Sequence, residues 1–96
     1  MKLLLTIYSG PNRQLVPGLL ERYEAGGYTE LTQAHGTGET GPRRGNRAWP
    51  GNASVVFSIL PDERTPELIA ALREEAARLT GDERLHVAVM PVETFF

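Results

Sequence analysis

A short apolar run near the start of the chain is the feature that most limits how it can fold. Residues Lys2–Tyr8 read KLLLTIY, so apolar side chains stand at neighbouring positions rather than only at alternating ones. Successive side chains of a strand point to opposite faces of its sheet, so a strand of this kind is buried on both faces. The run therefore predicts a central strand of a sheet that is covered on both sides.

Two helices are predicted from apolar residues that recur at helical spacing. The first spans Arg13–Glu24 and follows Asn12 as its N-cap. The second has the stronger pattern; it follows Thr65 as a cap and ends at Gly81. Three further strands are predicted from alternating or β-branched residues, at 28–35, 53–60 and 85–90.

The predicted order of elements is strand, helix, strand, strand, helix, strand. This β-α-β-β-α-β order predicts the ferredoxin-like α+β fold, in which two helices cover one face of a four-stranded antiparallel sheet. The other face is bare in a monomer, and here it would present Val, Phe or Tyr side chains whichever way the strands are phased. A bare apolar sheet face usually marks an interface between subunits, so we expect the chain to form an oligomer.

Length and composition fit one ordinary globular domain over residues 1–96. With 41% hydrophobic and 23% charged residues the chain is not of the disordered class, and its formal net charge of −2 gives no overall attraction to nucleic acid. The apolar run at the N-terminus is too short for a secretory signal, and no segment approaches the roughly 20 apolar residues of a membrane span. The absence of cysteine fits a reducing compartment. We expect a soluble, cytoplasmic protein.

The connection between the two middle strands, residues 36–52, is about three times as long as a hairpin needs. It reads GTGETGPRRGNRAWPGN and includes three arginines within five residues, Arg43, Arg44 and Arg47. Exposed backbone N–H groups and guanidinium groups suit phosphate or carboxylate, so this loop is a candidate anion site or a contact for an acidic partner. The alternative is that the three charges only keep a mobile loop in solution.

Trp49, the only tryptophan, stands beside Pro50 and Gly51 near the end of this loop. Tryptophan is enriched among the residues that dominate protein interfaces, so the segment is a candidate anchor for a partner protein. The alternative is a structural role, in which Trp49 folds back and fastens the base of the loop to the body of the domain.

No catalytic site, metal site or resident cofactor is predicted. Ser9 and Thr37 lie in no recognisable nucleophile motif. The two histidines, His35 and His86, do not have the i, i+4 spacing of a helical zinc-binding motif. Acidic residues that could supply a third metal ligand are Glu30, Glu39 and Glu93.

Nearly the whole chain resembles the P-II (PII) family of nitrogen-regulatory signalling proteins, specifically its small PII-like branch. The resemblance rests on GGYTELTQAHGTG before the loop, NASVVFSILPDE after it, the helix Pro66–Thr80, and VAVMPVE at the end. It implies a homotrimer with its sheets facing inward and small effectors, usually adenine nucleotides, bound in clefts between subunits. It also implies that the long loop contacts a partner protein, such as a membrane transporter.

In the family the base of the long loop lines the ligand cleft, and the corresponding residues here are Gly36, Thr37, Gly38 and Glu39. The chain departs from typical members before the last strand, where their glycine- and lysine-rich phosphate-binding loop is replaced by TGDE, residues 80–83. Typical members also continue into a tail with phosphate-binding arginines, whereas this sequence ends at Phe96 and its loop has no tyrosine for uridylylation. These departures argue against classical ATP and 2-oxoglutarate sensing.

The leading hypothesis is a trimeric PII-like regulator without catalytic activity. It would bind a small anionic metabolite or nucleotide at the base of the loop and the loop arginines, and ligand binding would order the loop and change what it can dock against. The alternative is a divalent-metal-binding trimer similar to the CutA-type ion-tolerance proteins, which share the fold. A third possibility is a trimer that acts only as an interaction scaffold.

Overall fold

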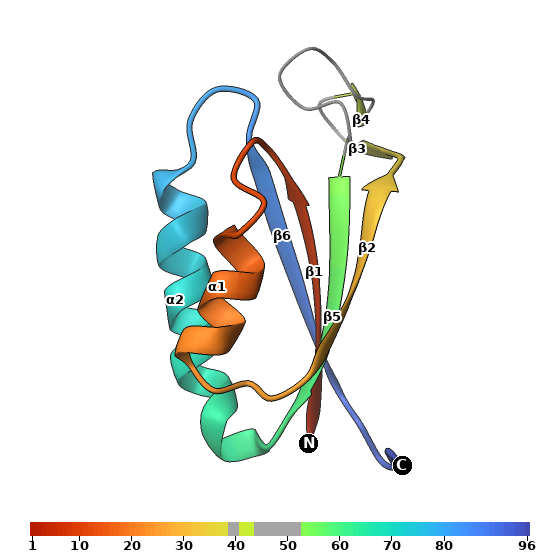
Figure 1. Ribbon diagram of the computed structural model, residues 1–96, viewed down its shortest axis with the longest axis vertical. Coiled ribbons are helices and arrows are strands. Elements are labelled where there is room, and N and C mark those ends of the chain that lie inside the picture. The colour runs from red at the N-terminus through yellow and green to blue at the C-terminus, as the bar shows by residue number, and fades with distance from the viewer. Residues whose placement is uncertain (39–40, 44–52) are drawn as a thin grey trace.

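A four-stranded antiparallel sheet with both helices on one of its faces forms the body of the protein (Figure 1). The structure is a computed structural model and describes residues 1–38, 41–43 and 53–96. It confirms the ferredoxin-like α+β fold and adds a small hairpin between the two middle strands. The elements are β1 (Lys2–Ser9), α1 (Leu15–Arg22), β2 (Tyr28–Ala34), β3 (Gly36–Gly38), β4 (Gly41–Arg43), β5 (Ala53–Leu60), the 3₁₀ turn η1 (Asp62–Arg64), α2 (Thr65–Arg78) and β6 (Arg84–Pro91).

β1 occupies a central position in the sheet, as its apolar run predicts. The strand order is β2-β5-β1-β6, so β1 has a hydrogen-bonded neighbour along each side. Both registers run without a shift and place Tyr8 opposite Ser54 of β5 and Ser9 opposite Arg84 of β6. Successive β1 side chains therefore alternate cleanly between the two faces of the sheet.

The main core lies between the sheet and the two helices. From β1, Leu4 and Tyr8 belong to this layer, with 1% and 4% of their surfaces exposed. Complete burial of a leucine side chain contributes about 1.5–3 kcal/mol, so this layer supplies much of the stability of the fold. The other buried apolar residues of the layer are Leu15, Val16, Leu19 and Leu20 of α1, Ala25 after α1, Val56 and Leu60 of β5, and Leu68, Ala71 and Leu72 of α2.

α1 begins later than the predicted helix Arg13–Glu24 and lacks the predicted cap. Pro17 lies in its first turn, where backbone N–H groups have no intrahelical partner and proline is therefore tolerated. The predicted role of Asn12 as the N-cap is wrong. Its Oδ1 accepts a hydrogen bond from the backbone N–H of Gln14 at 3.2 Å, so the side chain stabilises the turn before the helix.

Both helices end earlier than predicted: left-handed Glu24 follows α1 closely, whereas α2 gives way to extended backbone at its C-cap, Leu79 (ψ 144°). α1 ends two residues before Glu24 (φ 52°), and α2 ends three residues before Gly81 (φ 64°). Thr65 is the first residue of α2 rather than its cap, since η1 runs directly into the helix; its hydroxyl donates to the Pro61 carbonyl at 3.0 Å. Neither described helix is long and apolar enough to cross a membrane.

The sheet face turned away from the helices, which we call the open face, is strongly apolar. On β5, Val55, Phe57 and Ile59 point to this face, whereas the helix-covered face of the same strand presents two serines beside its buried valine and leucine. No described helix or strand covers the open face (Figure 1). Its apolar residues are Leu3, Leu5 and Ile7 of β1, Leu31 of β2, Val55, Phe57 and Ile59 of β5, and Ala88 and Met90 of β6.

Gly18→Ala is expected to stabilise the protein. Gly18 lies inside α1, and a Cβ added there meets no atom within 4 Å, so alanine improves helix propensity without a clash. We expect the free energy of unfolding to rise by about 0.5–1 kcal/mol, measured by urea denaturation. Gly10→Ala is the control and should lower the free energy of unfolding, because its Cβ would lie 2.6 Å from Cζ of Tyr8. A stabilising effect of both substitutions would contradict this packing.

Candidate functional site

The segment after β2 starts as an ordered hairpin rather than as the irregular loop expected over residues 36–52. β3 pairs with β4 in the antiparallel register Gly36–Arg43, Thr37–Pro42 and Gly38–Gly41. Two residues, 39 and 40, separate the two strands in the sequence, which is the length of a tight hairpin connection, and three of the six strand positions are glycine. The hairpin extends beyond the upper ends of β2 and β5 in Figure 1.

This hairpin gathers four of the predicted site residues in one small ribbon. Gly36, Thr37 and Gly38 form β3, and Arg43 lies opposite Gly36 at the end of β4. The structure therefore brings an arginine of the loop next to the predicted base of the ligand cleft. The remaining predicted site residues lie outside the described residues: Glu39, Arg44, Arg47, Trp49, Pro50 and Gly51.

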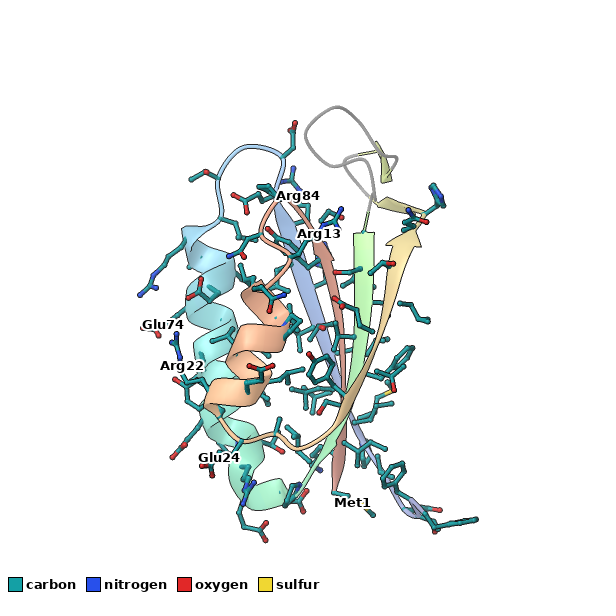
Figure 2. The ribbon with its side chains drawn as sticks, in the orientation of Figure 1. Met1, Arg13, Arg22, Glu24, Glu74 and Arg84 are labelled. Atoms are coloured by element: carbon teal, nitrogen blue, oxygen red, sulfur yellow. The ribbon has the colours of Figure 1, made fainter. Side chains whose placement is uncertain are left out.

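Two turns lie at the same end of the sheet as the hairpin. The first, residues 10–14, connects β1 to α1, and the second, residues 79–83, connects α2 to β6. Figure 2 shows Arg13 on the first turn and Arg84 directly after the second, both at this end. Arg84 is half-buried, and its Nη1 donates to the carbonyl oxygens of Gly81 (3.2 Å) and Glu83 (2.7 Å), so the guanidinium closes the second turn.

The hydroxyl of Tyr8 connects these two turns. It donates a hydrogen bond to Glu83 Oε2 at 3.0 Å and accepts one from the backbone N–H of Asn12, also at 3.0 Å. Burial raises the pKa of Tyr8 above its ordinary value; the Asn12 hydrogen bond acts against this, whereas Glu83 adds to it. The hydroxyl is therefore protonated at neutral pH and available as a donor.

Ser9, the last residue of β1, has a buried hydroxyl without a partner. Only 8% of the residue surface is exposed, and Oγ is the one buried side-chain nitrogen or oxygen atom in the described part of the chain that makes no hydrogen bond. A buried hydroxyl left unpaired costs about 1–3 kcal/mol. Among the described residues no base lies within hydrogen-bond reach of this oxygen, so the arrangement offers no activated serine nucleophile.

Sequence patterns point to none of these residues as a group. Tyr8 belongs to an apolar strand and Arg84 to the start of another, and only the pairing of β1 with β6 places both turns together. Only Glu83 stands out in the sequence, because an acidic residue beside an expected phosphate site predicts that the phosphate is repelled. The structure adds a partner that the sequence does not reveal: the Glu83 carboxylate is half-buried and accepts a hydrogen bond from Tyr8.

The two histidines do not form a metal site within one chain. His35 follows β2 and His86 lies in β6, and these strands are the two opposite edges of the sheet. Three strand spacings separate the edges, which is about 14 Å. Across residues 1–38, 41–43 and 53–96, no three His, Asp or Glu side chains come close enough together to bind a metal ion.

Known protein-family profiles and curated proteins give no match to the sequence. Solved structures do match. CPII, a nitrogen regulatory PII-like protein from Thiomonas intermedia K12 solved with ADP, AMP and bicarbonate bound, matches 93% of this chain and 86% of its own, with a TM-score of 0.69 and 21% identity. The chain has the PII-like fold. The resemblance predicted from the sequence is confirmed at this level.

Two further structures support the same assignment of the PII-like fold. The apo form of CPII matches 95% of this chain and 89% of its own, with a TM-score of 0.64 and 17% identity. A protein from Thermus thermophilus, described as a candidate PII-like signalling protein, matches 92% of this chain and 83% of its own, with a TM-score of 0.65 and 24% identity. The likeness thus covers nearly the full length of each protein, not a shared fragment.

Ser9→Ala is expected to stabilise the ligand-free protein. The substitution removes a buried hydroxyl that has no hydrogen-bond partner and keeps the Cβ, so nothing that the strand needs is lost. We expect the free energy of unfolding to rise by about 1 kcal/mol, measured by chemical denaturation. The control is Thr6→Val on the same strand. Thr6 is also buried, but its hydroxyl donates to the Val56 carbonyl at 3.4 Å, so its removal should not give the same gain in stability. A loss of stability on Ser9→Ala would contradict the assignment of Ser9 as unpaired.

Proposed function

We propose that this protein is a PII-like regulatory protein that binds a small anionic effector, an adenine nucleotide or a similar anion, at the hairpin end of the sheet. The observation that supports this most directly is the match over 93% of the chain to CPII, which was solved with ADP, AMP and bicarbonate bound. Within this chain, the same end combines glycine backbone, two turns and several arginines. The cytoplasmic location expected from the sequence stays a prediction.

The chemistry of the β3–β4 hairpin supports an anionic ligand. The glycines at Gly36 and Gly38 allow a ligand to approach the backbone closely, and Arg43, across from Gly36, is of a residue type that pairs with phosphate or carboxylate. Arg44 and Arg47 follow in the sequence. The carboxylate that the sequence places nearby, that of Glu83, is held in a fixed position by a hydrogen bond from Tyr8.

A partner protein is the second part of the proposal. The segment 36–52 would change its conformation when the anion binds, and Trp49, Pro50 and Gly51 would supply its contact with a partner such as a membrane transporter. Fixing the backbone of one residue costs about 1–2 kcal/mol, so a ligand that orders several loop residues must offset several kcal/mol. The affinity for the effector should therefore be modest and easily changed by a partner.

The open face supports a homotrimer with the sheets facing inward. It presents Leu5, Val55 and Phe57 along the middle of the sheet, and no described element covers them. Contiguous apolar patches of this kind on a small domain usually mark an interface. In such an assembly the ligand site at the end of each sheet would lie beside a neighbouring subunit, as expected for PII-like proteins.

The first prediction concerns the effector. In a thermal-shift panel of AMP, ADP, ATP and bicarbonate, we expect at least one adenine nucleotide to raise Tm. A ligand present at 100 times its Kd stabilises the folded state by about 2.7 kcal/mol, which is measurable in a domain of this size. The shift should be lost in Arg43→Ala/Arg44→Ala, because both guanidinium groups are removed. Arg73→Ala, on the exposed side of α2, is the control and should respond like the wild type.

If no nucleotide or bicarbonate shifts Tm in the wild type, the anion-binding proposal is wrong and the scaffold alternative gains support. A shift that survives in the double arginine variant would leave anion binding in place but would move the site away from the loop arginines.

The second prediction concerns the assembly. Met90 and Val89 are neighbours on β6 with the same exposed fraction, 40%, but Met90 points to the open face and Val89 to the helix side. By light scattering after gel filtration, we expect the wild type at three times the chain mass. Met90→Glu should shift the distribution toward monomer, because a charge would be buried in the interface, whereas Val89→Glu should not. A monomeric wild type, or equal masses for both variants, would contradict the proposed trimer.

A further inference from the structure

We propose that Tyr8 is a positioning residue for the ligand site: its hydroxyl ties the β1–α1 turn to the α2–β6 turn, so that both turns hold one fixed arrangement at the end of the sheet. This inference rests on the proposed function, because it concerns the same end of the molecule. Tyr8 itself need not touch the ligand. Its role would be to set the relative position of two backbone segments that flank the hairpin.

A continuous chain of hydrogen bonds supports this role. On one side, the Asn12 N–H donates to the Tyr8 hydroxyl at 3.0 Å, and the Asn12 carbonyl accepts the N–H of Leu15, the first residue of α1, at 3.1 Å. On the other side, the hydroxyl donates to Glu83 Oε2 at 3.0 Å, and the Glu83 N–H donates to the Thr80 carbonyl at 3.3 Å. One hydroxyl thus links the start of α1 to the turn that leads into β6.

The position of the hydroxyl is fixed by packing as well as by hydrogen bonds. The ring of Tyr8 belongs to the main core and is 4% exposed, so it cannot swing out without opening that core. Gly10 lies directly against the end of the ring, where an added Cβ would be 2.6 Å from Cζ. A side chain at position 10 would therefore displace either the ring or the turn, which explains why glycine suits this position.

The same hydrogen bond sets the position of the Glu83 carboxylate. Its carboxylate would otherwise be free to face an anion bound at this end of the sheet, next to Arg84. Held by Tyr8, it is half-buried against the first turn, while the Arg84 guanidinium closes the second turn through the carbonyls of Gly81 and Glu83. Loss of the Tyr8 hydroxyl would therefore both loosen the turns and release a carboxylate toward the ligand.

The decisive experiment compares Tyr8→Phe with Glu83→Gln. Tyr8→Phe keeps the buried ring but removes the link; Glu83→Gln keeps an acceptor for Tyr8 but removes the charge. In the ligand-free protein, Tyr8→Phe should speed amide hydrogen exchange at residues 10–14 and 80–84 together, and leave β5 unchanged. Tyr28→Phe is the control, because Tyr28 lies on β2 with 38% of its surface exposed and away from both turns.

Affinity for ADP supplies a second readout, with opposite signs for the two variants. Loss of one positioning hydrogen bond should weaken ADP binding roughly three- to tenfold in Tyr8→Phe. Glu83→Gln should bind ADP more tightly than the wild type, because it removes repulsion without removing the link. General destabilisation cannot produce this difference in sign.

Each outcome has a clear reading. Exchange that is unchanged in Tyr8→Phe, or raised at one turn alone, would overturn the proposal, as would equal ADP affinities for Tyr8→Phe and Tyr28→Phe. If the wild type bound neither ADP nor any other anion of the panel, the proposed function would fail. The exchange measurement would still decide independently whether Tyr8 couples the two turns.

Discussion

The structure depends on the pairing of β1 with a strand on each side. Because its apolar side chains point to both faces, β1 must be covered on both, yet the two helices cover only one. Leu4 and Tyr8 meet the helices, whereas Leu5 and Ile7 point to the open face. In the single chain the open face therefore keeps uncovered apolar side chains, and this is the physical basis of the proposed association through that face.

The same strand also leads into the end of the sheet where we propose the ligand site. β1 ends at Ser9, and the turn that follows lies at the same end of the sheet as the β3–β4 hairpin and the turn before β6. Tyr8 is at once a core residue and a polar link, since its ring is buried and its hydroxyl reaches both turns. Buried tyrosines usually find a hydrogen-bond partner, and here the two partners belong to segments that flank the site. The Tyr8 side chain thus contributes both to the stability of the core and to the arrangement of the two turns beside the proposed site.

The PII-like fold by itself does not define the ligand. A likeness at about 20% identity shows that the same layers and strand order can form from a different sequence, because burial pattern and not residue identity specifies the sheet. Beside the match to CPII, the functional proposal therefore needs support from residues of this chain. The residues that support it are the glycines of β3, Arg43 opposite Gly36, and Glu83, whose carboxylate is held by Tyr8.

The sequence alone determined the order of the four strands of the main sheet and the two helices, the central place of β1 and the bare apolar face. Each follows from local periodicity or from glycine and proline, which act over a few residues. The tertiary structure decided which residues meet. The link from Asn12 through Tyr8 to Glu83 joins positions up to 75 apart in sequence, and the unpaired hydroxyl of Ser9 is visible only once its surroundings are packed. Such contacts depend on strand register and on the path of two turns, which no local pattern encodes.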